Sequence, residues 1–148
     1  MASCIDHIVI AVKDLEKCKR VFSSVFKGKF LKDAVLPEQN ARAAYFLVGD
    51  IVIGLETPLS ENGDIHNFIE RRGEGIHHIA FNIDEIDDLH THLINSGVKV
   101  AGIEKSHGVR KDLFTHPKSS FGLLMQLIEW EKPFKNSLEK RIETLGNE

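Results

Sequence analysis

The chain has 148 residues, of which 42% are hydrophobic, 28% charged and 7% aromatic, and these proportions favour a folded globular protein over a disordered one. Its net charge is −3, with 19 basic and 22 acidic residues mixed along the chain, so we expect no nucleic-acid partner. No apolar run approaches the roughly 20 residues of a membrane span, so we expect no membrane contact. The two cysteines have no CxxC spacing, which favours reduced thiols and a cytoplasmic location.

The first half of the chain begins with an alternating apolar run at 7–12, and apolar residues at helical spacing follow it from Leu15 to Phe26. Asp14 can cap the start of this helix, and Gly28 suits its end. Further strands are expected at 30–35, 41–48 and 51–56, followed by a short helix at 64–72. The pattern therefore predicts the element order β-α-β-β-β.

The second half of the chain repeats this order. The segments DHIVIAVKDLEK and HHIAFNIDEIDD align at an offset of 71 residues, which pairs His7 with His78. GDIVIGLETP and SFGLLMQLIE align at an offset of 72, which pairs Gly54 with Gln126. The expected elements of this half are a strand at 78–83, a helix that Asp84 can cap and Gly97 can end, strands at 99–103, 111–115 and 123–129, and a terminal helix at 133–145.

Alternation along each strand assigns its side chains to two faces. One face carries bulky apolar residues that a helix can cover, while the other mixes small and polar residues and is expected to line a cavity. This polar face carries His7, Glu56, His78, Asn82 and Gln126. A single strand-end histidine is most often structural, but two histidines at equivalent positions of a repeat favour a metal site.

Three segments of the sequence resemble a known family. IDHIVIAVKDLEK, GIHHIAFNIDEID and HPKSSFGLLMQLIE are similar to the vicinal oxygen chelate (glyoxalase/bleomycin-resistance/dioxygenase) superfamily, and most closely to its methylmalonyl-CoA epimerase-like branch. The resemblance implies an α+β, glyoxalase-like fold, in which paired βαβββ modules form an open curved sheet around a central cavity, usually in a homodimer. The modules, about 5–72 and 76–130, then form a single domain over 5–130, with a helical extension at 131–148.

The same resemblance implies a divalent metal held by residues on the first and last strand of each module. Carried over position by position, the ligands are His7, His78 and Gln126, and the fourth position falls on Gly54. Glycine has no side chain to offer, and Gln126 has an amide oxygen that can bind a metal but cannot take up a proton. The metal can be zinc, cobalt, nickel, manganese or iron.

Epimerisation next to a thioester carbonyl needs a base to remove a proton and a metal to stabilise the enolate. The carboxylates of the family fall at Gln126 and near Ala43, and neither residue is acidic. Glu56 lies on the polar face two residues after Gly54. It is interpreted as a third metal ligand beside the two histidines, as a base, or as a solvated carboxylate at a strand end. Glu56 and Gln126 are the candidate catalytic residues.

The leading hypothesis is therefore a metal-dependent epimerase or isomerase that acts on a small carbonyl or acyl-CoA substrate. One alternative is a glyoxalase-type lyase or an iron-dependent dioxygenase on the same fold. Another is a small-molecule-binding protein without catalysis, which the two missing carboxylates favour. Whether one chain forms the site or a partner chain contributes to it is left open by the sequence.

Overall fold

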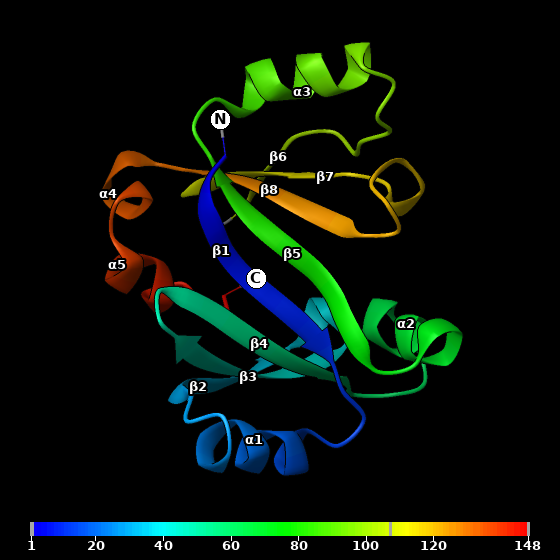
Figure 1. Cartoon of the computed structure of the whole chain (residues 1–148), viewed down its shortest axis with the longest axis vertical. Helices are drawn as coiled ribbons and strands as arrows, with labels where there is room; N and C mark the ends of the chain where they lie inside the picture. The colour runs from blue at the N-terminus through cyan, green and yellow to red at the C-terminus, as the bar shows by residue number, and fades with distance from the viewer. Residues whose placement is uncertain (1, 107, 148) are drawn as a thin grey trace. The chain divides into compact units, whose positions relative to one another are not determined.

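The computed structural model describes residues 2–106 and 108–147. The elements of the first half are β1 (Ala2–Ala11), α1 (Leu15–Ser24), β2 (Lys29–Leu36), β3 (Ala41–Val48), β4 (Ile51–Pro58) and α2 (Asp64–Arg72). Those of the second half are β5 (Gly75–Ile83), α3 (Ile86–Asn95), β6 (Glu104–Ser106), β7 (Arg110–Phe114), β8 (Leu124–Trp130), α4 (Lys132–Lys135) and α5 (Leu138–Glu143). The repeated order of strands and helices confirms the predicted α+β class with paired βαβββ modules (Figure 1).

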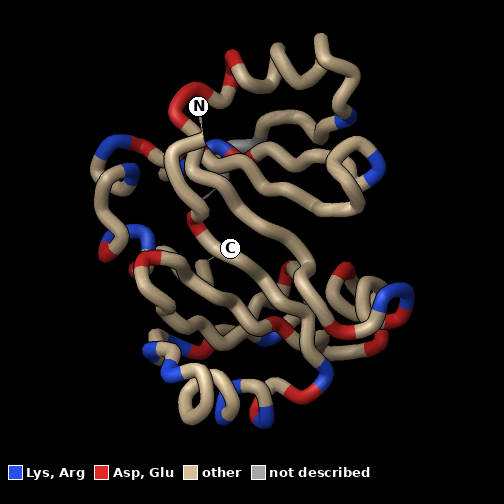
Figure 2. The backbone as a smooth tube through the Cα atoms, viewed as in Figure 1, with Lys and Arg blue, Asp and Glu red and all other residues tan. Residues whose placement is uncertain are grey.

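The chain divides into two compact units. We call His7–His77, with the segment after Arg141, the N-terminal unit, and His78–Arg141, with the segment before His7, the C-terminal unit. The boundary falls within β1, so this strand contributes residues to both. Lys and Arg are interspersed with Asp and Glu along α1 and α2 (Figure 2). Within the described residues, no helix is long and apolar enough to cross a membrane.

The N-terminal unit has the strand order β2-β3-β4-β1, with β1 parallel to β4 and the other neighbours antiparallel. One face of this sheet packs against α1 around Leu15, Phe46 and Leu55. As predicted, Asp14 caps this helix, because its carboxylate accepts a hydrogen bond from the Lys17 amide at 3.0 Å. The apolar strand face is thus buried under the helix that follows β1.

The helix α2 covers part of the opposite, polar face of this unit. Ile65 and Ile69 from α2 pack against Ala11 of β1 and Ala41 of β3. The small alanine side chains let the helix approach the sheet closely. The polar face of the N-terminal unit is therefore closed at the end of β1 that carries Ala11.

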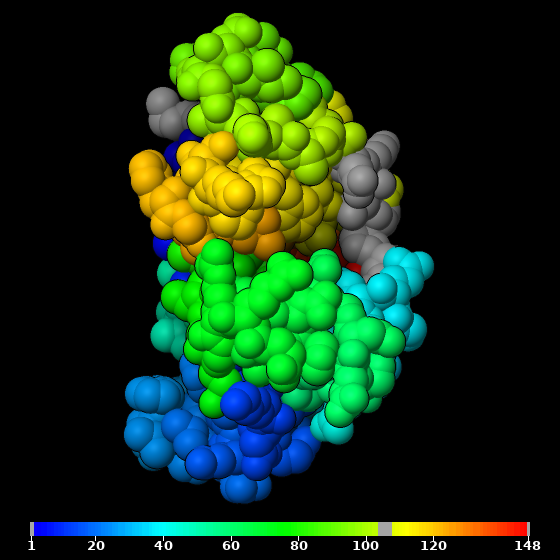
Figure 3. Space-filling view, turned by 90° about the vertical axis from the view of Figure 1, so that its right-hand side faces the viewer, coloured from blue at the N-terminus to red at the C-terminus, as the bar shows by residue number. Residues whose placement is uncertain are grey.

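The C-terminal unit has the order β5-β8-β7-β6, with β5 parallel to β8. Its apolar face packs against α3 around Ile83, Ile86 and Leu127. The Ile86 amide at the start of α3 donates to the Glu129 carboxylate of β8 at 3.0 Å. Glu129 lies on the face away from Gln126, as alternation along β8 predicts. The loop between β7 and β8, yellow to orange in Figure 3, lies at the surface.

Three local predictions for the second half were wrong. Asp84 does not cap α3; it pairs with Lys135 at 2.7 Å, and Glu129 supplies the acceptor for the helix instead. No strand runs over 99–103, where a single bridge joins Val100 to Thr115, and the strand begins only at β6. The expected helix over 133–145 is two short helices, α4 and α5.

The break between α4 and α5 has a local cause. The Ser137 amide bonds to the Phe134 carbonyl, which closes a turn at the end of α4. The Ser137 hydroxyl then accepts from the Lys140 amide at 3.2 Å, as a residue that starts a new helix does. The Ser137 side chain competes with the helical backbone for hydrogen bonds, so the apolar spacing alone predicts too long a helix.

Candidate functional site

Register within the C-terminal unit brings His78 and Gln126 onto one face of neighbouring strands. His78 is paired with Leu124 and Ala80 with Gln126, so the two side chains are diagonal neighbours across β5 and β8. The His78 ring lies edge-on to Phe114 of β7, with ring centroids 6.3 Å apart. Two of the predicted metal ligands are therefore adjacent within one unit.

Gln126 is held by a buried carboxylate that the sequence analysis did not single out. Its side-chain nitrogen Nε2 donates to Asp112 Oδ1 of β7 at 3.0 Å, and both residues are at least 95% buried. The other carboxylate oxygen of Asp112 accepts from Arg110 Nε at 3.2 Å. Both oxygens of Asp112 therefore have a donor, and its charge is balanced by the guanidinium group.

This hydrogen-bonded network continues away from Gln126. Arg110 lies over the Trp130 ring, 5.2 Å from its centroid. The Trp130 indole N–H donates to Asp6 at 2.9 Å, and the same Asp6 oxygen is 3.3 Å from Arg141 Nε. These contacts hold Asp112 in place, and Asp112 in turn holds the amide nitrogen of Gln126.

Asn82 adds a second polar group to this face. It lies on β5 two residues beyond Ala80, and only 3% of its surface is exposed. Its side-chain oxygen Oδ1 is buried without a hydrogen-bond partner among the described residues. A buried acceptor of this kind favours a bound donor or cation, since leaving it unpaired costs about 1–3 kcal/mol.

The N-terminal unit repeats the register with different side chains. His7 is paired with Val52 and Val9 with Gly54, so Gly54 stands to His7 as Gln126 stands to His78. The space of the absent side chain is filled from β3, because a Cβ at Gly54 would lie 3.2 Å from Tyr45 Cε1 and 3.4 Å from a Val9 methyl group. Tyr45 is 8% exposed. The fourth ligand position of the family is thus covered by the Tyr45 ring.

Glu56 is not a solvated carboxylate at a strand end. Only 4% of its surface is exposed, and it is paired with Ala11 of β1 and Ala43 of β3. The interpretation as a solvated group is therefore wrong, because the flanking alanines are themselves buried and α2 covers this end of the face. Glu56 of β4 thus lies directly across from Ala43 of β3, near which the resemblance implied an acidic residue.

The remaining histidine next to the site has a separate environment. His77 lies edge-on to Phe68 of α2, with centroids 5.2 Å apart. Burial lowers the pKa of His77, against a smaller opposing effect of the Asp64 carboxylate. Its contact with α2 agrees with the opposite orientation that alternation assigns to His77 and His78.

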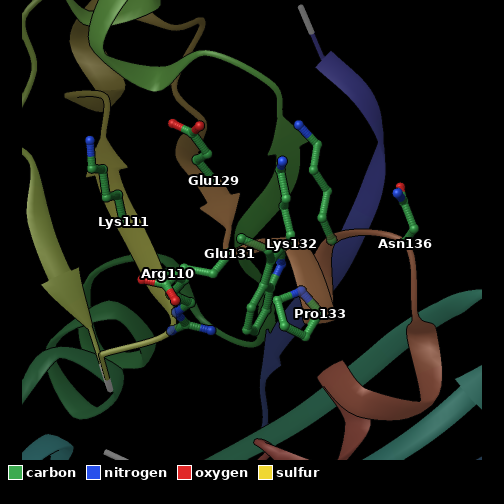
Figure 4. Close-up of a pocket in the computed structure, with 9 residues that line it drawn as sticks. Arg110, Lys111, Glu129, Glu131, Lys132, Pro133 and Asn136 are labelled. Atoms are coloured by element: carbon green, nitrogen blue, oxygen red, sulfur yellow. The ribbon is translucent and has the colours of Figure 1, made fainter.

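A separate pocket of about 810 Å³ lies at the edge of the C-terminal unit (Figure 4). Its lining residues come from β7, β8 and α4 and include both charge signs: Arg110, Lys111, Glu129, Trp130, Glu131, Lys132, Pro133, Lys135 and Asn136. Most of its charged groups already have partners. Lys111 pairs with Asp87 at 2.6 Å, Lys135 with Asp84, and Arg110 with Asp112. None of the predicted site residues lines this pocket.

The side chains of the polar faces can bind a divalent ion only if Gln126 is one of the ligands. Within residues 2–106 and 108–147, no three His, Cys, Asp or Glu side chains are gathered closely enough to hold a metal ion. A metal site on the polar faces would therefore need the Gln126 amide oxygen beside imidazole nitrogen. Such donors suit zinc, cobalt, nickel, manganese and iron. Gln126 faces Asp112 through its nitrogen, which leaves its oxygen available.

Comparison with known proteins gives one family. The family model for the Glyoxalase/Bleomycin resistance protein/Dioxygenase superfamily matches residues 6–114. The chain is 30% identical over 132 residues to the protein YqjC of Bacillus subtilis, covering 84% of this chain and 91% of that protein. It is 28% identical over 132 residues to ethylmalonyl-CoA/methylmalonyl-CoA epimerase of Cereibacter sphaeroides, covering 86% of this chain and 98% of that protein.

A solved structure agrees with these relatives. Methylmalonyl-CoA epimerase of Streptomyces coelicolor, in complex with 2-nitronate-propionyl-CoA, superposes with a TM-score of 0.76 and 26% sequence identity. The superposition covers 89% of this chain and 100% of that one. The fold that the resemblance implied is confirmed.

Proposed function

Because the chain belongs to the glyoxalase/bleomycin resistance protein/dioxygenase superfamily, we propose that it is a metal-dependent isomerase of the epimerase type that acts on an acyl-CoA thioester. Relatives named as epimerases of methylmalonyl-CoA, at 25–29% identity, support the reaction class. The S. coelicolor epimerase, which holds a propionyl-CoA derivative, supports the substrate class. The alternative lyase and dioxygenase reactions have no comparable support among these relatives.

The observation that carries the proposal is the burial of Glu56 between Ala11 and Ala43. A carboxylate on the polar face, screened from bulk water by α2, is suited to remove the proton next to a thioester carbonyl. Gln126 cannot take this role, because an amide does not accept a proton at ordinary pH. We therefore assign proton transfer to Glu56 and metal binding to His7, His78 and Gln126.

A divalent metal, when bound, would polarise the thioester carbonyl and stabilise the negative charge that develops on its oxygen. His7 and His78 would supply nitrogen donors to it, and Gln126 would supply an amide oxygen. Glu56 would then hold the abstracted proton until it exchanges with water, and the configuration inverts when the planar enolate takes a proton from solvent on its opposite face.

The test is proton exchange at the carbon next to the thioester. Cobalt-loaded protein is incubated with methylmalonyl-CoA in deuterated water, and deuterium uptake and epimerisation are followed by NMR. We expect uptake by the wild type and a loss of at least about 100-fold in Glu56→Gln, the usual contribution of general acid–base catalysis. Absence of uptake by the metal-loaded wild type would contradict the proposal.

Glu129→Gln is the matched control for this experiment. Glu129 is also a β-strand carboxylate, but it lies on the apolar face and accepts from the Ile86 amide. A glutamine oxygen can still accept that bond, so we expect the exchange rate of Glu129→Gln to stay within about twofold of the wild type. An equal loss in both variants would remove Glu56 from the proposed role.

Tyr45 over Gly54 favours a second candidate, a protein that binds an acyl-CoA without turning it over. In this case the Tyr45 ring occupies the space next to Gly54, where the resemblance implied a metal ligand, and forms part of the surface that binds the acyl-CoA. Calorimetric binding of methylmalonyl-CoA without deuterium uptake would favour this candidate over the isomerase.

A further inference from the structure

The buried contact between Asp112 and Gln126 determines which way the Gln126 amide points. A carboxylate can only accept hydrogen bonds, so the amide nitrogen must face Asp112 and the amide oxygen must face away from it. Arg110 occupies the other oxygen of Asp112 and can only donate. Asp112 therefore cannot stabilise the reversed amide, whose oxygen would face the carboxylate.

The neighbours of Gln126 on its own face direct this oxygen further. Ala80, fully buried, lies beside it on β5, and Phe114 lies beside it on β7. Neither side chain has a polar atom to compete for the oxygen. Two polar side chains of β5, His78 and Asn82, each lie one diagonal step from Gln126, and His78 carries the imidazole nitrogen that suits a metal.

We propose that Asp112 is a positioning residue, which holds the Gln126 amide with its oxygen presented to the cation that Gln126 and His78 share. The proposal rests on the proposed function only for the presence of that cation. Asp112 also places a negatively charged carboxylate on the nitrogen side of the uncharged Gln126 amide. A partner of this kind both orients a metal ligand and raises the electron density on the ligand oxygen.

The structure also explains why residue 126 is glutamine and not glutamate. A glutamate there would place a second carboxylate about 3 Å from Asp112, and two carboxylates at that distance repel each other. The amide instead donates to Asp112. Asp112 and Gln126 thus work as a pair in which the charge lies on β7 and the ligand oxygen on β8.

The decisive variant is Asp112→Asn. Its side chain has one acceptor oxygen, and Arg110 and Gln126 both need an acceptor. Since Arg110 can only donate, we expect it to keep the oxygen, and the amide nitrogen of the new side chain then faces residue 126. The Gln126 amide must reverse to accept from it, which withdraws the ligand oxygen. We expect Co²⁺ affinity to fall by about 10- to 100-fold in calorimetry.

The double variant Asp112→Asn/Gln126→Glu should restore the Co²⁺ affinity that the single variant loses. A glutamate at 126 accepts from the new amide nitrogen with one oxygen and presents the other, so we expect Co²⁺ affinity within about threefold of the wild type, well inside the 10- to 100-fold loss of the single variant. Asp87→Asn is the matched control for charge, because Asp87 is an exposed carboxylate paired with Lys111 in the same unit. We expect it to leave Co²⁺ affinity unchanged.

A second measurement needs no variant to fold. In the ¹⁵N-labelled wild type without metal, the Gln126 side-chain amide protons should exchange at least about tenfold more slowly than those of Asn136, an exposed amide. Equal exchange rates would overturn the proposal. So would unchanged Co²⁺ affinity in Asp112→Asn, a double variant no better than the single one, or wild-type protein that binds Co²⁺ no more tightly than His78→Ala.

These outcomes are separable from the proposed function. If the binding pattern is as expected but methylmalonyl-CoA takes up no deuterium, the isomerase proposal fails and the role of Asp112 stands.

Discussion

The two units share one strand order but differ on their polar faces. In the C-terminal unit, the position on β8 that is diagonal to His78 carries Gln126, whose amide donates to Asp112, and Asp112 accepts from Arg110. In the N-terminal unit, the same position is Gly54, covered by Tyr45. The acidic group of that unit is Glu56, two residues further along β4.

This difference shows which part of a repeated module is free to change. The apolar faces must both bury a helix, so both keep large aliphatic residues under α1 and α3. The polar faces carry small side chains where a helix packs on them, as Ala11 and Ala41 do under α2. At the position diagonal to the first-strand histidine, the C-terminal unit has an amide held by a carboxylate, whereas the N-terminal unit has a glycine.

The largest expected effect tests whether both modules supply the metal site. His7→Ala and His78→Ala should each lower Co²⁺ affinity by more than about 100-fold, beyond the loss from an outer contact, because each removes a direct ligand. Elemental analysis of the purified variants measures the same loss as metal content. His92→Ala, an exposed helical histidine, is the control and should retain its metal. A variant of His7 with full metal content would confine the site to the C-terminal unit.

An intermediate effect tests the closed position of the N-terminal unit. Gly54→Gln must displace the Tyr45 ring, since the new Cβ would lie 3.2 Å from it. We expect the free energy of unfolding to fall by about 1–3 kcal/mol in urea titrations, as overpacked cores do. Adding Tyr45→Leu should return part of this loss and raise Co²⁺ affinity through the restored amide. If Gly54→Gln leaves the free energy of unfolding unchanged, the Tyr45 ring does not fill the space next to residue 54.

The smallest effect compares how the two modules start their helices. α1 is capped locally by Asp14, whereas α3 receives its acceptor from Glu129 on β8. We expect Asp14→Ala and Glu129→Ala each to lower the free energy of unfolding by about 1 kcal/mol, with Asp14→Asn nearly neutral. Urea denaturation measures all three. If Glu129→Ala is neutral, the Ile86 amide must find another acceptor, and the long-range cap contributes nothing.

Some contacts at the site could be predicted because a tight turn fixes the register of two strands. The two residues Gly49 and Asp50 join β3 to β4, and a hairpin of this length pairs Val48 with Ile51. Counting back from that pair places Tyr45 opposite Gly54, and Ala43 opposite Glu56. Alternation within β4 is enough to identify Glu56, whereas Tyr45 follows only from this register.

The contact between Asp112 and Gln126 had no equivalent signal. The chain between β7 and β8 runs over residues 115–123 and contains a short 3-10 turn, so its length does not set a register. Asp112 also stands in a charged run beside Lys111, which is typical of a solvated strand edge. Only the observed pairing of Phe114 with Gln126 brings the carboxylate to the amide.

The hydrogen bond between Asp6 and Trp130 joins residues 124 positions apart in the chain. Asp6 of β1 therefore belongs to a unit whose other strands follow much later in the chain. Until β8 emerges, the Asp6 carboxylate has neither Trp130 nor Arg141 to bind. Such long-range closure slows folding and leaves the beginning of β1 exposed as an unpaired strand during synthesis. The start of β1 thus leaves the ribosome well before β8, the strand that carries its hydrogen-bond partner Trp130.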